Sequence, residues 1–348
     1  MVATISEQTL GTLATGEEVK QFILRNASGA EAKFCNLGAA WVGFKLTHDS
    51  ENLVLGCDTL EAFINQGASL GATIGRFANR IKGGQFSIDN QTVSVSQNMA
   101  NDHIHGGFEG YSKKIWQSHI ALVNEHPTLT FRYLSADGEE GFPGQLDVAV
   151  TVTLTDSNSV SFEYTAQPHA RTVVNLTNHV YFNLQGAQSG NLNDHEFKIN
   201  ASHYVEADST GMPTGSINTV AGTALDLTQW KNIATELNDQ QDPTIARAHG
   251  YDHCYCLDNN GEQSSVAFAR AEGIQLTCTT TLPGVQFYTG NFLGNTPIND
   301  SQVYKTHGAF CFEPGYWPDS PNHAHFPDCT FDNSHPYSAI IEYRFTQL

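Results

Sequence analysis

A strict alternation of apolar and polar residues in the middle of the chain restricts its fold more than any other feature. Five aliphatic residues from Leu146 to Leu154 occupy every second position, and a turn-forming Asp-Ser-Asn-Ser run at 156–159 separates them from a second alternating stretch that ends at Ala166. Because successive side chains of a β-strand point to opposite faces, each stretch has one apolar face to bury. The pattern predicts a β-hairpin with one buried face.

Shorter runs of the same kind recur along the chain, and Gly, Asn, Asp and Pro residues separate them. They predict further strands at 92–96, 129–135, 274–282 and 339–345, whereas helix is expected at 59–66 and in parts of 227–238. Many short strands between turns favour an all-β sandwich or barrel. No repeat, low-complexity linker or charge block marks a boundary, so we expect one domain over residues 1–348.

The acidic composition excludes whole classes of partner. The 348 residues include 36 Asp+Glu and 17 Lys+Arg, which gives a formal net charge of −19. Nucleic acids and anionic membranes are bound through clustered Lys and Arg, so we expect neither as a partner. No stretch of 18 apolar residues predicts a transmembrane helix, and the first ten residues do not resemble a signal peptide. We therefore expect a cytoplasmic protein.

The spacing of the cysteines does not indicate a disulfide framework. There are seven of them, an odd number without paired spacing: Cys35, Cys57, Cys254, Cys256, Cys278, Cys311 and Cys329. Cys254 and Cys256 occupy alternate positions of a strand-like run, which is compatible with a metal or redox pair or with free thiols in a strand. We favour free thiols, because disulfides are rare in cytoplasmic proteins.

Cationic and amide side chains gather in the run GATIGRFANRIKGG at 71–84. Arg76, Asn79, Arg80 and Lys82 lie within seven residues there, in a chain with few cations. Arg offers fixed hydrogen-bond donors and Asn adds an acceptor, which suits recognition of vicinal hydroxyl groups. A surface turn with solvated cations is the alternative interpretation.

A histidine pair follows in the run NDHIHGG. His103 and His105 are two residues apart and would share a strand face, and together with Glu109 they weakly resemble the first half of a cupin metal motif. The pair is equally compatible with one histidine that contacts a ligand, or with two hydrogen-bonded turn histidines. The sequence leaves these interpretations open.

Two further titratable residues stand in apolar surroundings. His179 lies in the Asn- and aromatic-rich run 175–184, where it is either a core histidine or an oriented acid–base group. Glu313 follows Phe310–Phe312 at the expected end of an apolar strand, where burial would raise the pKa of its carboxyl and make it a usable general base. Asp252 and Gln286 are candidates for hydrogen-bonding a polar ligand, and the alternative is that they hydrogen-bond the backbone of a turn. Phosphate-loop, nucleophile-elbow and zinc motifs are absent, which favours proton transfer on an uncharged ligand.

Seven motifs, in order, resemble the aldose 1-epimerase (galactose mutarotase) family. They are GATIGRFANRI (71–81), HGG (105–107), DGEEGFPG (137–144), VNLTNHVYFNL (174–184), GYDH (250–253), PGVQFYTGNFLG (283–294) and FEPGYWPDSPNH (312–323). The resemblance spans roughly Glu18 to the C-terminus. It implies a large antiparallel β-sandwich, often called a supersandwich, with a sugar site on its concave face. It also implies interconversion of the α and β anomers of galactose and glucose, in galactose metabolism, without a cofactor or metal.

The resemblance also assigns residues. It implies that His179 is the general acid and Glu313 the general base, and that the sugar contacts are Asn79, Arg80, His105, Tyr181, Asp252 and Gln286. Arg76 belongs to the same motif, but we interpret it as structural support. Many family members have Glu-Thr-Gln where this chain has Glu313-Pro314-Gly315, which puts the fine substrate preference in doubt. The expected partner is a small aldose, and the protein is expected to be a monomer or a homodimer.

The hypothesis is ring opening, in which Glu313 takes the O1 proton while His179 donates a proton to O5. A nearby Glu313 would raise the pKa of His179 and burial would lower it, and the sequence does not decide between them. Three alternatives remain: a non-catalytic sugar-binding protein, a hexose-6-phosphate 1-epimerase that uses the cations of 71–84, and a cupin-like metal enzyme.

Overall fold

We analysed a computed structural model, which describes residues 2–237, 241–259 and 261–348. The hairpin predicted from the alternation is present as β12 (Leu146–Leu154) and β13 (Ser159–Pro168), which pair in antiparallel register. Every second residue of β12, from Leu146 to Leu154, is buried, as predicted. All pairings between strands within the described ranges are antiparallel.

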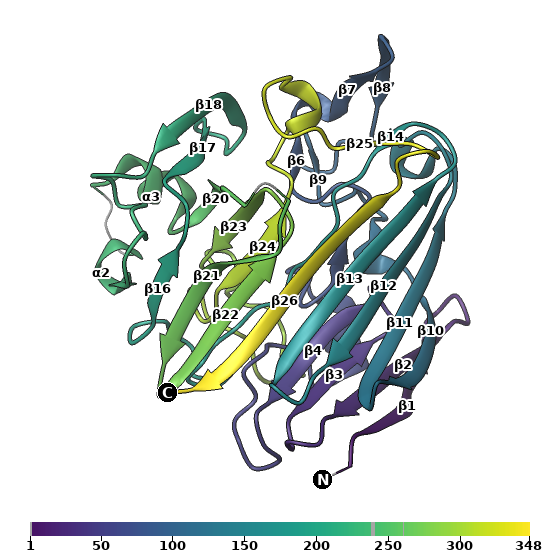
Figure 1. Cartoon of the computed structure of the whole chain (residues 1–348), viewed down its shortest axis with the longest axis vertical. Helices are drawn as coiled ribbons and strands as arrows, with labels where there is room; N and C mark the ends of the chain where they lie inside the picture. Colours follow the sequence, from purple (N-terminus) through teal and green to yellow (C-terminus); the bar gives the residue numbers. More distant parts are fainter. Residues whose placement is uncertain (1, 238–240, 260) are drawn as a thin grey trace.

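One large sheet combines strands from both halves of the chain (Figure 1). Its strand order is β10 (Gln117–Val123), β11 (His126–Ser135), β12, β13, β26 (Tyr337–Gln347), β22 (Ile274–Thr280), β21 (Ser264–Ala271), β16 (Glu196–Ile199) and β19 (Lys231–Asn232). The C-terminal strand β26 lies between β13 and β22, and so joins the earlier strands to the later ones.

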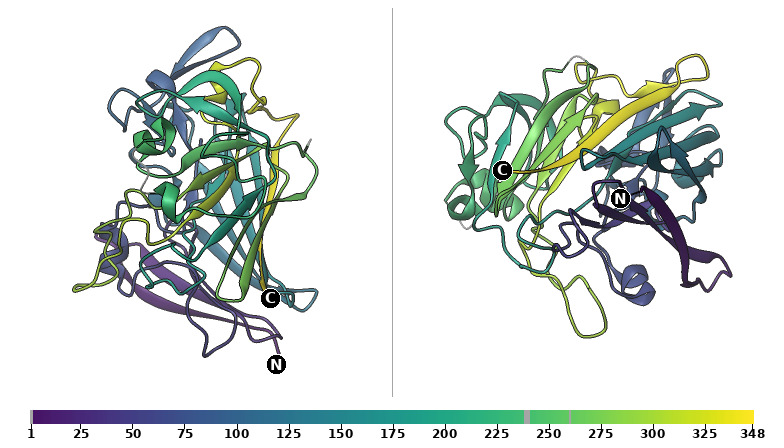
Figure 2. Two further views of the ribbon diagram at one scale, coloured as in Figure 1. Left: turned by 90° about the vertical axis from the view of Figure 1, so that its left-hand side faces the viewer. Right: turned by 60° about the horizontal axis from the view of Figure 1, so that its bottom comes forward.

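Two smaller sheets lie on the same side of the large sheet (Figure 2, left). One has the order β1 (Thr4–Thr12), β2 (Glu18–Arg25), β3 (Glu31–Cys35) and β4 (Ala40–Lys45). The other has the order β18 (Pro213–Thr219), β17 (His203–Ala207), β20 (Asp252–Cys256), β23 (Gly284–Tyr288) and β24 (Cys311–Gly315).

Short strand pairs and helices complete the fold. The pairs are β5 (Thr73–Ile74) with β15 (Thr177–Asn178), β6 (Arg80–Ile81) with β9 (His103–Ile104), β7 (Gln85–Ile88) with β8 (Gln91–Ser94), and β14 (Thr172–Val173) with β25 (Thr330–Phe331). The helices are α1 (Leu60–Asn65), α2 (Ala234–Leu237) and α3 (Pro243–Ala248). In the part of the chain that the structure describes, no helix has the length and apolar character needed to cross a membrane.

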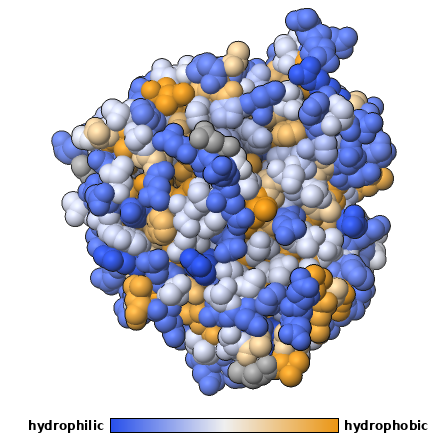
Figure 3. Space-filling model, in the orientation of Figure 1, coloured by the Kyte–Doolittle hydropathy of each residue, from blue (hydrophilic) through white to orange (hydrophobic). Residues whose placement is uncertain are grey.

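Aromatic side chains fill the space between the layers. Trp41 of β4 packs against two residues of the large sheet, with ring centroids 5.7 Å from Phe162 and 5.8 Å from Tyr343. Phe197 of the large sheet meets Phe287 of β23 at 4.9 Å. These contacts bury the apolar face of each smaller sheet against the large sheet, which is the packing of a β-sandwich. The opposite face of the large sheet is mostly hydrophilic or neutral, with scattered hydrophobic residues (Figure 3).

The predicted elements are largely confirmed. Strands cover most of 129–135, 274–282 and 339–345, whereas at 92–96 strand β8 ends at Ser94. The helix expected at 59–66 is α1, and Thr59 caps it by accepting from the Ala62 amide. In 227–238, α2 is a single turn preceded by the two-residue strand β19, and residue 238 lies outside the described residues. Helix α3 was not predicted.

Candidate active site

The alternation of side chains along β23 and β24 separates a core face from a polar face. Phe287 and Phe312 are cross-strand neighbours that point into the core, and Gln286 and Glu313 are neighbours in the next register position. Since successive residues face opposite sides, Gln286 and Glu313 share the face that points away from the large sheet. One prediction was wrong here, because Glu313 lies in the middle of β24 and not at the end of its strand.

Strand β24 continues past Glu313 through Pro314 and Gly315, the two residues that differ from the family pattern. Both residues fit the positions that they occupy in the sheet. β24 is the edge strand of its sheet, and Pro314 pairs with Val285 while Gly315 pairs with Gly284. Proline has no amide hydrogen to donate, so it is tolerated on an edge strand. A side chain at Gly315 would approach Asn175 Oδ1 to 3.1 Å, so a small residue suits this position.

A cavity of about 530 Å³ opens over this polar face. All eight residues that the resemblance assigned to the site line it: Asn79, Arg80, His105, His179, Tyr181, Asp252, Gln286 and Glu313. They come from β6, β20, β23, β24 and the turns beside β5, β9 and β15, so the fold gathers them from distant parts of the chain. The cavity can hold a ligand the size of a monosaccharide.

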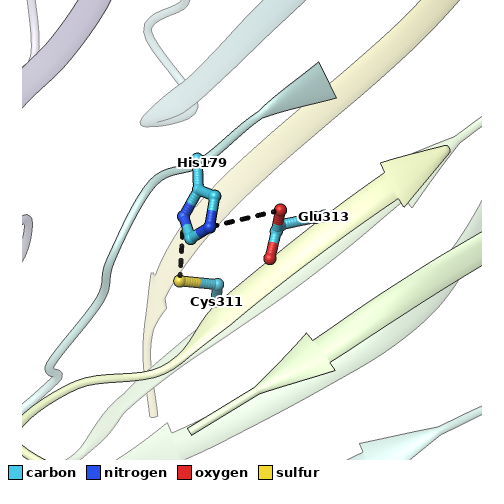
Figure 4. A group of neighbouring side chains, drawn as sticks. All are labelled: His179, Cys311 and Glu313. Atoms are coloured by element: carbon cyan, nitrogen blue, oxygen red, sulfur yellow. Dashed lines mark hydrogen bonds and ion pairs between the residues drawn. The ribbon is translucent and has the colours of Figure 1, made fainter. Parts of the chain in front are cut away.

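The side chains of His179 and Glu313 point toward each other (Figure 4), and both line the cavity. The distance from His179 Nε2 to Glu313 Oε2 is 3.7 Å, and both side chains are more than 90% buried. The His179 backbone is held on both sides, because its amide donates to the Ala72 carbonyl and its carbonyl accepts from the Gly71 amide, each at 2.9 Å. The ring of Tyr181 stacks on the imidazole at a centroid distance of 5.0 Å. These contacts fix the position of His179 and the orientation of its imidazole.

Burial shifts the pKa of the two groups in opposite directions. It lowers the pKa of the His179 imidazole to about 4. It raises the pKa of the Glu313 carboxyl well above its ordinary value, and the neighbouring Asp252 carboxylate adds to this effect. The question left open by the sequence is thus decided by burial. Burial therefore favours the uncharged pair, with its shared proton on Glu313.

His105 is fixed as a neutral hydrogen-bond donor. The Asn79 amide donates to His105 Nδ1 at 3.2 Å, so the ring hydrogen is on Nε2. Burial, and secondarily the nearby His179 and Arg80, lower the pKa of His105 well below its usual value, so the ring stays uncharged. The next residue must be glycine, because a side chain at Gly106 would lie 1.8 Å from the Gly75 carbonyl oxygen.

Arg80 forms an ion pair with Asp252, and both residues line the cavity. Arg80 Nη2 lies 3.5 Å from Asp252 Oδ2, and Gln286 Nε2 donates to Asp252 Oδ1 at 2.6 Å. This pairing, which the sequence did not predict, neutralises the one permanent positive charge among the described residues that line the cavity. Gln286 Oε1 is buried and accepts no hydrogen bond from any described residue, so it is available to a ligand hydroxyl.

Arg76 is a structural residue, as we interpreted it from the sequence. Its guanidinium is buried outside the cavity, where Nη1 donates to the carbonyl oxygens of Pro143 at 2.9 Å and Gly144 at 2.8 Å. Its Nη2 donates to Ser135 Oγ at 2.6 Å. The arginine of the first motif therefore anchors the loop that carries the DGEEGFPG motif.

The cupin-like interpretation of His103, His105 and Glu109 is wrong. His103 is fully buried and its Nδ1 bonds the Ser96 carbonyl oxygen at 2.7 Å. In the described ranges, the group of side chains close enough to share a metal ion is a different one, His179, Cys311 and Glu313. The cysteines are free thiols, as predicted, and Cys254 and Cys256 of β20 pack with Val205 and Phe326 in a small hydrophobic cluster.

Several residues of the cavity wall were not predicted from the sequence. Tyr288 and Phe292 belong to the same motif as Gln286. Tyr288 lies two positions after Gln286 on β23 and therefore on the same face, so the strand alternation could have identified Tyr288. The segments 65–69 and 294–297 also line the cavity. No local pattern indicates them, because only the folded chain brings these loops to the site.

Comparisons with known proteins agree with this architecture. The family model described as aldose 1-epimerase matches residues 20–344. The chain is 37% identical to the aldose 1-epimerase of Escherichia coli (strain K12), over 95% of this chain and 96% of that protein. It is 39% identical to the galactose mutarotase of Homo sapiens, over 85% of this chain and 84% of that protein.

Solved structures show the same fold. The crystal structure of galactose 1-epimerase from Lactobacillus acidophilus NCFM matches with a TM-score of 0.89 at 25% identity and covers 99% of both chains. The structure of an aldose epimerase homologue from C. elegans matches with a TM-score of 0.83 at 26% identity and covers 100% of both chains. Together with the cavity and its residues, these matches show that the chain belongs to the aldose 1-epimerase family.

Proposed function

We propose that this protein is a mutarotase that interconverts the α and β anomers of aldohexoses such as galactose and glucose. The observation that carries the proposal is the pair His179–Glu313, 3.7 Å apart on the wall of a cavity of monosaccharide size. An imidazole and a carboxyl at this separation can transfer protons at two neighbouring oxygen atoms. The names of the relatives, aldose 1-epimerase and galactose mutarotase, support the same reaction.

The reaction needs one acid and one base close together. Opening the hemiacetal removes a proton from O1 and adds one to O5, and both oxygens are bonded to C1. Glu313 accepts the O1 proton, and His179 Nε2 donates to O5. Rotation about the C1–C2 bond of the open aldehyde presents its other face, and closure with reversed roles restores the original protonation state. A pair that holds one proton provides both roles throughout the cycle.

Substrate binding must move the shared proton from Glu313 to His179. Burial by itself favours the uncharged pair with the proton on Glu313. Hydroxyl groups that donate to the Glu313 carboxylate stabilise its charged form and so favour the tautomer with the proton on His179. The sugar thereby helps to create the reactive state in which it is opened.

The remaining cavity residues suit an uncharged, hydroxyl-rich ligand. His105 Nε2 and the side-chain amide of Asn79 supply donors, and the free Oε1 of Gln286 supplies an acceptor. Arg80 and Asp252 offer further donors and acceptors around their ion pair. A phosphate ester would need an unpaired cation, and Arg80 already has Asp252 as its partner, so the hexose-6-phosphate alternative is disfavoured.

Polarimetry of freshly dissolved α-galactose tests the proposal, with glucose and glucose 6-phosphate as comparison sugars. The proposal requires faster mutarotation of galactose or glucose than of the phosphate ester. Binding of galactose without acceleration would instead indicate a sugar-binding protein. We retain the cytoplasm and galactose metabolism as the proposed cellular context, supported by the seven free thiols and by the relatives' names.

A further inference from the structure

Cys311 lies directly behind the acid–base pair, and the mutarotase reaction gives it no role. Cys311 and Glu313 are two residues apart on β24 and therefore share a face. The thiol sulfur is 3.7 Å from His179 Nδ1, and the Glu313 carboxylate is 3.7 Å from His179 Nε2 (Figure 4). One nitrogen, one sulfur and one oxygen atom from these residues all lie within 4.8 Å of one another.

This combination of atoms matches the ligand preference of zinc. Zn²⁺ binds imidazole nitrogen, thiolate sulfur and carboxylate oxygen, and an accessible zinc site has three protein ligands and one open position. Tetrahedral Zn–N and Zn–S bonds place the nitrogen and sulfur about 3.5 Å apart, close to the separation of His179 Nδ1 and Cys311 Sγ. His179 and Glu313 also line the adjoining cavity, which gives an ion access to the site from that side.

The charge around the site also favours a divalent cation. The described residues that line the cavity include the carboxyl groups of Asp252 and Glu313 and the guanidinium of Arg80. Arg80 pairs with Asp252, so its charge is already balanced. An ion that displaces the proton of Glu313 would therefore face a carboxylate without a second unpaired cation among these residues to repel it.

We propose that His179, Cys311 and Glu313 form an inhibitory binding site for Zn²⁺ and for other thiolate-preferring divalent cations. The ion binds between His179 Nδ1 and Cys311 Sγ, and the thiol proton and the proton of the Glu313 carboxyl are both released to solvent. Glu313 turns from Nε2 toward the ion and completes the site. The base Glu313 is then bound to the ion and cannot accept the O1 proton, so sugar opening stops. Inhibition, unlike binding, rests on the proposed mutarotase function.

Cobalt tests binding independently of activity. The full-length protein is freed of metal with a chelator and titrated with Co²⁺, whose bond to a thiolate gives a near-ultraviolet charge-transfer absorption. We expect this absorption at one Co²⁺ per chain, its loss on addition of Zn²⁺, and its absence in Cys311→Ser and Cys311→Ala. Cys57→Ser is the matched control, because Cys57 is the half-buried cysteine, and it should retain the absorption. A band that persists in both Cys311 variants, or no band in the parental protein, would refute the site.

Zinc titration of galactose mutarotation tests the inhibition. Each variant is compared with its own metal-free rate, and circular dichroism confirms that it is folded. We expect Zn²⁺ to inhibit the parental protein, a chelator to restore activity, and the Cys311 variants to need at least about 10-fold more zinc, since even the loss of an outer partner weakens metal binding 10–100-fold. Equal zinc sensitivity of these variants, or equal inhibition by Mg²⁺, would overturn the proposal. If no sugar is turned over, the mutarotase function fails, while the cobalt absorption still decides the site.

Discussion

Replacement of Glu313 by glutamine removes the proposed base but keeps the size of the side chain. The other carboxylate among the described cavity residues, Asp252, is occupied by Gln286 at 2.6 Å and Arg80 at 3.5 Å, so it cannot substitute. A positioned general base contributes about 10²–10⁴-fold to a rate. We therefore expect Glu313→Gln to lower kcat for α-galactose mutarotation, followed by polarimetry, by about 10²-fold or more, which is about 2.7 kcal/mol in the barrier.

The same variant should be at least as stable as the parental protein at neutral pH. Burial raises the pKa of Glu313 in the folded state, so its contribution to the free energy of unfolding is complete below the unfolded-state pKa and is lost as the pH rises through the folded-state pKa. A pKa that is higher by one in the folded state than in the unfolded state corresponds to about 1.4 kcal/mol. Glutamine does not titrate, so Glu313→Gln should have a higher free energy of unfolding than the parental protein at pH 7. Denaturant unfolding should show a smaller difference between the two proteins at pH 4.

The control is Glu163→Gln, which makes the same change in charge at an exposed position of β13 on the large sheet. It should leave the rate of mutarotation unchanged, because Glu163 lies outside the cavity. A folded Glu313→Gln protein with near-parental kcat would refute the assignment of the base. A variant that loses activity because it unfolds at neutral pH would refute the account of the buried carboxyl.

Three further predictions test the pair, the cation and the buried arginine. The pH profile of kcat/KM should fall on the acid side near pH 4, where His179 becomes protonated in addition to Glu313, and an acid limb near pH 6.5 would contradict the lowered pKa of His179. Asp252→Asn should leave Arg80 unpaired, so galactose 6-phosphate should inhibit galactose mutarotation more strongly than in the parental protein; unchanged inhibition would contradict the ion pair. Arg76→Met should lower the free energy of unfolding in denaturant by about 3 kcal/mol or more, because charge-assisted hydrogen bonds of a buried guanidinium are lost, and a loss below about 1 kcal/mol would contradict its structural role.

Much of the fold could be predicted because strand periodicity is a local property. The alternation from Leu146 to Leu154 shows in the sequence which face of β12 is buried, and the structure buries that face. The order of strands in a sheet is not local, so nothing in the sequence of β26 indicated that it lies between β13 and β22. The expectation of one domain over residues 1–348 and the oligomeric state remain predictions.

The cavity residues were found because each lies in a short contiguous motif that resembles a known family. The geometry that gives them a function lies in no motif. The 3.7 Å separations of His179 from Glu313 and from Cys311 join β24 to the turn after β15, and the ion pair of Arg80 with Asp252 joins β6 to β20. Such distances follow from long-range packing and leave no pattern in the sequence.

The sequence by itself determined an antiparallel β fold, the family and the chemical types of the site residues, because alternation and contiguous motifs can be identified without knowing the fold. Only the tertiary structure decided that burial outweighs the neighbouring carboxyl and lowers the pKa of His179, and that Arg80 is neutralised by Asp252. The physical reason is that desolvation and charge pairing depend on which distant segments close over a group, and a linear sequence does not specify that enclosure.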